Sequence, residues 1–132
     1  MVYTHDYDSR YLHGPALPVI ELQIRRVGRE TSDSVLTVIV DSGADATILP
    51  LRTLKEAQLK RVGQARMRWG PHAGELYDVY LATLVIGPYQ IFGVRILADK
   101  ENRQKILGRN ALNQLIVTLN GLAGVVEIRN GS

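Results

Sequence analysis

The stretch of residues 35–44 reads Val-Leu-Thr-Val-Ile-Val-Asp-Ser-Gly-Ala. Its first six residues are mostly β-branched and apolar, which favours a central strand buried on both faces. Asp41 follows that strand directly and precedes Ser-Gly, a turn signal. A carboxylate at the end of a buried strand is costly unless it has a partner or a task. Asp41 is therefore either a candidate for catalysis or the start of an Asx-type turn.

The rest of the chain predicts a strand-rich domain with few helices. Alternating apolar residues and Gly-Pro turn signals predict strands over 17–27, 65–69, 75–86 and 89–97. Short helices are expected at 51–59, with Pro50 near the start, and at 111–115. A closing hairpin is expected over 116–128, around Asn120-Gly121.

Two segments, taken together, resemble one known family. Residues 40–49, Val-Asp-Ser-Gly-Ala-Asp-Ala-Thr-Ile-Leu, resemble the catalytic loop of the retropepsins, which are the retroviral-type aspartic proteases. Residues 106–112, Ile-Leu-Gly-Arg-Asn-Ala-Leu, are similar to the Gly-Arg helix segment of the same family. Between them, residues 69–74 lie between two predicted strands, where that family carries its flap. The order and spacing of these motifs agree over residues 17–120.

This resemblance implies a mainly β fold, a closed β-barrel like half of an acid protease, with one or two short helices. Residues 16–132 would form the domain, after a polar N-terminal tail at 1–15. Two carboxylates that share a proton can activate water and protonate a peptide carbonyl. The chain has a single Asp-Ser-Gly, so the second carboxylate must come from another copy in a twofold homodimer. We therefore expect a homodimeric aspartic endopeptidase that acts on peptide or protein substrates.

The resemblance also assigns roles to individual residues. Asp41 would be the catalytic residue, and Ser42 and Gly43 would complete the active-site loop. Arg109 would pair with Asp45 and, with Gly108, support that loop, and we expect the ion pair to be buried. Substrate contacts are expected from Ala44, Asp45, Ala46, Ile48 and Ile106. The flap would consist of Trp69, Gly70, Pro71, His72, Ala73 and Gly74.

Some features depart from the viral pattern and keep an alternative open. Pro71 and His72 occupy the flap tip, where the viral enzymes are rich in Gly and Ile, and the chain continues as a strand after Asn120. Gln104 is polar where the viral enzymes are usually apolar. The ending is more similar to cellular and bacterial retropepsin-like proteins, so the viral dimer contacts cannot be transferred. The same fold could instead serve as a dimerisation or peptide-binding module with weak or no turnover.

The composition limits which other classes of function remain possible. The 132 residues carry 16 Lys or Arg against 13 Asp or Glu, a net charge of +3, and no Cys, which excludes a disulfide framework. Residues 52–68 are locally basic, but a solvated face is the favoured interpretation and a nucleic-acid binder ranks lowest. The three histidines are scattered, so we expect no metal and no other cofactor. Without a membrane-length apolar run or a signal peptide, the chain is expected to be cytoplasmic, with no membrane partner.

Overall fold

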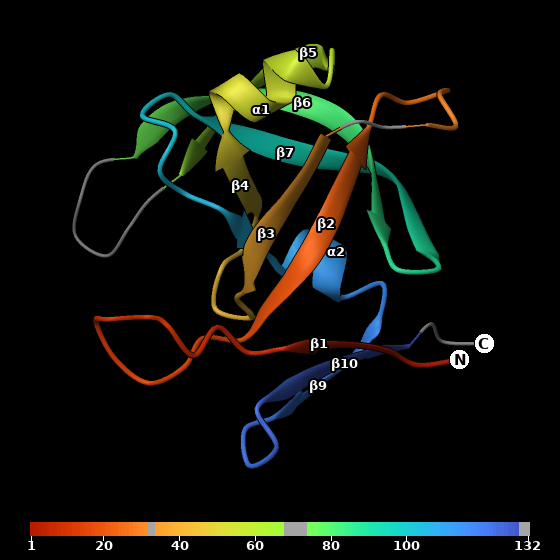
Figure 1. The fold of residues 1–132 in the computed structure, drawn as a ribbon. Coiled ribbons are helices and arrows are strands. Elements are labelled where there is room, and N and C mark those ends of the chain that lie inside the picture. The colour runs from red at the N-terminus through yellow and green to blue at the C-terminus, as the bar shows by residue number, and fades with distance from the viewer. Residues whose placement is uncertain (32–33, 68–73, 130–132) are drawn as a thin grey trace.

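A computed structural model describes residues 1–31, 34–67 and 74–129. These residues form ten strands and two short helices (Figure 1). The helices are α1 (Leu51–Glu56) and α2 (Arg109–Leu112), close to the two predicted positions. Neither described helix is long and apolar enough to cross a membrane.

The larger sheet contains seven strands in the order β2-β3-β8-β4-β7-β6-β5. It bends so that β2 also pairs with β6, through Gln23↔Val85 to Arg25↔Thr83. The closed barrel itself stays a prediction. The strands of this sheet are β2 (Val19–Arg25), β3 (Ser34–Val40), β4 (Thr47–Pro50), β5 (Lys60–Met67), β6 (Glu75–Ile86), β7 (Tyr89–Asp99) and β8 (Ile106–Leu107).

The apolar core lies on the inner side of this bent sheet. Alternating residues of β2 point into it, and Ile20, Leu22 and Ile24 have no exposed surface. In β3 the burial also alternates, because Val38 is fully buried whereas Val35 is 49% exposed. The expectation that this strand is buried on both faces was therefore wrong: its apolar residues outnumber the positions that the core covers.

The smaller sheet contains three strands from the two ends of the chain, in the order β1-β10-β9. They are β1 (Tyr3–Asp6), β9 (Ile116–Asn120) and β10 (Val125–Arg129), and β9 and β10 form the predicted hairpin. Residues 3–6, within the predicted N-terminal tail at 1–15, pair with β10. The domain boundary at residue 16 stays a prediction. Figure 1 shows this sheet beneath the larger one, with both chain ends beside it.

The short strand β8 determines how the site is built. It lies between β3 and β4, pairing in parallel with β3 and antiparallel with β4. The segment 41–46 joins β3 to β4 and must therefore cross the end of the strand between them. The predicted catalytic loop is this crossing segment, and α2 follows β8 directly in the chain.

Candidate functional site

Asp41 starts a tight loop that is held by backbone hydrogen bonds. Its backbone N–H donates to the carbonyl of Leu107 over 3.1 Å, which continues the β3–β8 pairing by one residue. Its side-chain Oδ1 accepts the N–H of Gly43 at 2.9 Å, and its carbonyl accepts the N–H of Ala44 at 3.2 Å. The Asx-type turn and the candidate catalytic position are thus the same structure. The carboxylate is half-buried, while Ser42 and Gly43 are exposed.

Gly108 packs closely against the backbone of the crossing loop. A Cβ atom at this position would be closer to the Ala46 carbonyl than real Cβ contacts ever are, and 3.0 Å from the Ala44 oxygen. The next residue, Arg109, donates its backbone N–H to the Ala44 carbonyl over 2.9 Å. The loop therefore rests on the start of α2, and it can do so only because residue 108 has no side chain.

Two polar residues that sequence analysis assigned no role connect the loop to α2. Thr47 is fully buried; its hydroxyl donates to Asn110 Oδ1 over 2.8 Å and accepts the Gly108 N–H at 3.1 Å. Asn110 in turn donates through Nδ2 to the Arg95 carbonyl over 2.8 Å. Both residues lie inside the two quoted motifs, so the signal was present. The contact between the two residues could not be predicted, because they are 63 positions apart in sequence.

Arg109 pairs with Asp45 as expected, but the pair is not buried. The Asp45 side chain is 73% exposed and that of Arg109 is 42% exposed. Arg109 also donates Nη1 to the Ser42 carbonyl over 2.8 Å, so one guanidinium holds two points of the loop. In the single chain this ion pair is therefore a surface interaction that aligns the loop, and the expectation of a buried pair is corrected.

The residues expected to contact substrate differ in their exposure. Ala46 and Ile106 are half-buried, and Asp45 is exposed. Ala44 is 3% exposed and Ile48 has no exposed surface, so in the single chain neither offers side-chain surface to a ligand. Ile48 instead forms a second apolar cluster with Tyr77 and Leu97, against which Ala46 and Met67 pack.

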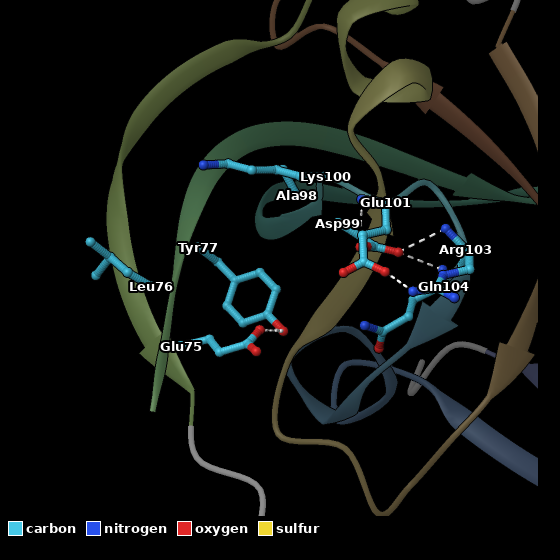
Figure 2. Close-up of a pocket in the computed structure, with 9 residues that line it drawn as sticks. All are labelled: Glu75, Leu76, Tyr77, Ala98, Asp99, Lys100, Glu101, Arg103 and Gln104. Carbon is cyan, nitrogen blue, oxygen red and sulfur yellow. Dashed lines mark hydrogen bonds and ion pairs between the residues drawn. The ribbon is translucent and has the colours of Figure 1, made fainter. Parts of the chain in front are cut away.

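A cavity of about 440 Å³ lies beside this second cluster, between the start of β6 and the segment after β7 (Figure 2). Asp41 is not one of its lining residues. Figure 2 shows β4 passing next to the cavity. Because the crossing loop at 41–46 leads directly into β4, the cavity lies to one side of that loop. Its walls carry charges of both signs and are formed by Glu75, Leu76, Tyr77, Ala98, Asp99, Lys100, Glu101, Arg103 and Gln104.

Asp99 organises one wall of this cavity. It is 6% exposed, and its carboxylate accepts the backbone N–H groups of Glu101 at 3.0 Å, Arg103 at 2.8 Å and Gln104 at 2.8 Å. The carboxylate thus replaces strand pairing for this segment, which satisfies buried donors. Sequence analysis assigned Asp99 no role because no turn motif marked it. Arg103 and Gln104 both line the cavity, and Figure 2 shows the Gln104 side chain pointing toward the side where Tyr77 and Glu75 lie.

The expected flap falls between two strands that pair up to Met67↔Glu75. Gly74 is described, and its carbonyl accepts Arg66 Nη1 at 2.8 Å. Trp69, Gly70, Pro71, His72 and Ala73 lie outside the described residues.

Residues 52–67 of the basic segment are divided between α1, β5 and the turn between them. Arg61 forms an ion pair with Asp78 at 3.1 Å, and Gln64 donates to the same carboxylate. The hydrogen bond from Gln64, followed by Arg61, holds the pKa of Asp78 below its usual value. Part of the local positive charge is therefore used within the β5–β6 hairpin. Across the described ranges no group of three or more His, Asp or Glu residues could hold a metal ion.

Comparisons with known proteins agree with this architecture. Residues 30–114, more than half of the chain, match the model of the family described as "gag-polyprotein putative aspartyl protease". Among solved structures, the chain is similar to a retropepsin-like aspartic protease from Rickettsia conorii, with a TM-score of 0.59 and 12% sequence identity. That match covers 97% of this chain and 91% of the other, and at this identity it concerns the fold alone. No curated protein matches this chain significantly.

Proposed function

We propose, from the premise that this chain belongs to the gag-polyprotein aspartyl protease family, that it is an aspartic endopeptidase active as a homodimer. The observation that carries the proposal is the crossing loop. It holds Asp41 at the end of β3 with its carboxylate on the Gly43 N–H, and Gly108 and Arg109 support it from below. A carboxylate fixed by backbone groups has the preorganisation that proton transfer requires.

In the proposed reaction, two Asp41 carboxylates, one from each chain, share one proton. The ionised carboxylate takes a proton from water as the water attacks the peptide carbonyl, and the protonated one donates to the carbonyl oxygen. Collapse of the tetrahedral intermediate breaks the C–N bond, and the amine leaves with a proton. No covalent enzyme intermediate is needed, which fits a loop without an activated nucleophile.

The free edge of β9 supports dimer formation. In the described part of the chain, β9 pairs with β10 alone, and its sequence Ile-Val-Thr-Leu-Asn has no charge and no Pro. In natural proteins, charged residues or Pro usually protect an edge strand from pairing with another chain, and β9 has neither. Ile116 is 50% exposed and Leu119 is 48% exposed. We propose antiparallel pairing of β9 with the same strand of a second copy, centred on Thr118, which would make a continuous six-stranded sheet.

The substrate would lie across the crossing loop and extend toward the cavity of Figure 2. Ala46 and Ile106 would contact it near the loop, and Gln104 and Arg103 further out, at the wall clamped by Asp99. Ala44 and Ile48 would then support the loop from inside, in line with their burial. Segment 69–74 would act as the flap, which excludes water when it closes.

Digestion of a peptide library by the wild type and by Asp41→Asn tests the proposal. The substitution keeps the shape but removes the base, so cleavage should fall by more than about a thousandfold. Circular dichroism should show that the fold is unchanged. Asp6→Asn, which changes an exposed carboxylate in β1, is the control and should keep full activity.

Two outcomes would contradict the proposal. Cleavage by Asp41→Asn at the wild-type rate would mean that the activity does not use this carboxylate. A wild-type dimer that binds library peptides without cutting them would instead indicate a peptide-binding module.

A further inference from the structure

A second cavity, of about 270 Å³, lies at the opposite end of β3 from Asp41. Ser34, the first residue of β3, lines it, and Asp41 follows the last residue of that strand. The other lining residues come from the end of β2, the turn after it and the end of α1: Ile24, Arg25, Arg26, Arg29, Thr31, Glu56, Ala57 and Gln58. It is therefore separate from the proposed peptidase site.

The described lining of this cavity is positively charged. Among the described residues that line it, three are arginines and one is a glutamate, a net charge of +2, and the others are mainly polar. The backbone N–H of Arg29 donates to the Arg26 carbonyl over 3.0 Å, and this turn brings the two residues together. Like charges held close together are unfavourable unless an anion offsets them.

One arginine has an unused buried donor. Among the described residues, the Arg25 Nε is a buried side-chain nitrogen without a hydrogen-bond partner. A buried donor left unpaired typically costs about 1–3 kcal/mol. A ligand that accepts a hydrogen bond from this Nε would remove that cost.

The neighbouring groups are already held in position. Arg29 Nη1 donates to Gln58 Oε1 over 2.9 Å, which links the turn after β2 to the end of α1. Gln58 has a φ of 57°, a left-handed conformation that is uncommon for a residue other than Gly. This conformation ends α1 in a standard C-terminal cap, in which the Gln58 N–H donates to the Lys55 carbonyl and the Leu59 N–H to the Leu54 carbonyl. It fixes the position of Gln58 beside the cavity.

We propose that this cavity binds a phosphate-type oxyanion. A dianion matches the net charge of the described lining, and a tetrahedral group can accept hydrogen bonds from more than one guanidinium group. A carboxylate carries one charge and needs a single arginine. The volume suits a phosphate group and is below the range of about 300–1,000 Å³ that is typical for larger organic ligands.

Titration of the intact protein with sodium phosphate, at constant ionic strength maintained with chloride, tests this proposal. Phosphate at ten times its Kd should raise the Tm by about 5 °C, and calorimetry should give one site per chain. Arg25→Gln and Arg29→Gln should each weaken phosphate binding about tenfold or more. Arg29 is exposed, so its variant should fold even if the Arg25 variant does not.

Two further variants sharpen the test. Glu56→Gln removes the opposing carboxylate and should tighten phosphate binding several-fold, while Arg95→Gln, an exposed arginine on β7 outside the cavity, should leave it unchanged. Titrations with AMP and acetate separate a phosphomonoester and a carboxylate from free phosphate. The proposal is overturned if phosphate does not bind, if acetate binds equally well, or if all variants respond as the wild type does. None of these readouts depends on peptidase activity.

Discussion

At the scale of single residues, the crossing loop depends on the absence of one side chain. A methyl group on Gly108 would collide with the backbone of Ala46 and touch that of Ala44, and backbone atoms cannot rotate away. We expect Gly108→Ala to destabilise the protein by about 3 kcal/mol or more. Urea unfolding followed by circular dichroism measures this loss.

Gly121 provides the matched control. It lies in the turn after β9, and a Cβ there would meet nothing within 4 Å. Gly121→Ala should change the free energy of unfolding by less than about 0.5 kcal/mol. Equal effects of the two substitutions would contradict the close approach at Gly108.

The exposure of the Asp45–Arg109 pair determines its contribution to stability. Because the Asp45 side chain is 73% exposed and that of Arg109 is 42% exposed, their coupling in monomeric protein should be below about 1 kcal/mol. Arg109→Gln should cost more than Asp45→Asn, since Arg109 also donates to the Ser42 carbonyl. A double-mutant cycle in dilute, monomeric protein checks both points. Coupling of about 3 kcal/mol would instead require a buried pair.

At the scale of elements, β1 joins the small sheet to the large one. Its Tyr3 ring packs against Gly87 in the β6–β7 turn, where a Cβ would collide with the ring. The Tyr89 hydroxyl, at the start of β7, donates to the Met1 carbonyl. The N-terminal residues are thereby fixed to the β6–β7 hairpin of the large sheet.

Burial raises the pKa of the Tyr3 hydroxyl above its ordinary value of 10.0. The folded state therefore holds this proton more tightly than the unfolded state, and the resulting stability is fully present below pH 10. It is lost as the pH rises from 10.0 toward the folded-state pKa. We expect Tyr3→Phe to lose less stability than the wild type between pH 9 and pH 11, as measured by urea unfolding. Parallel pH profiles for the two proteins would show that Tyr3 does not contribute.

At the scale of the whole molecule, activity should depend on the free edge of β9. Thr118 lies opposite Glu127 of β10, so Thr118→Lys places an opposite charge there and should leave the monomer stable. In the proposed dimer, two such lysines would meet at the twofold axis and repel. We expect sedimentation to show loss of the dimer, together with loss of any peptidase activity.

Thr118→Val is the control, because it keeps an uncharged, β-branched side chain at the same edge. It should form the dimer as the wild type does. If Thr118→Lys is still dimeric, the second copy binds through another surface, and the β9 pairing is wrong.

The sequence alone predicted much of the secondary structure. Alternation and turn signals located β2, the β6–β7 hairpin and both helices, because these elements depend on neighbouring residues. The motif at 40–49 indicated the family, which the family comparison confirms, and the fold is mainly β and retropepsin-like with two short helices. Asp41 stood out because it follows an apolar strand, and the resemblance of its motif to the retropepsin loop gave it the catalytic role, which stays a prediction.

Only the tertiary structure decided which partners these residues have. Thr47 and Asn110, the Asp99 clamp, and the pairing of β1 with β10 all join positions whose contact no local pattern encodes. Side-chain burial could not be predicted from the sequence either, because the exposure of Val35 and of the Asp45–Arg109 pair depends on what packs over them. A residue's chemistry and local conformation can be read from its neighbours in sequence, whereas its solvent exposure and long-range hydrogen bonds are properties of the assembled sheets.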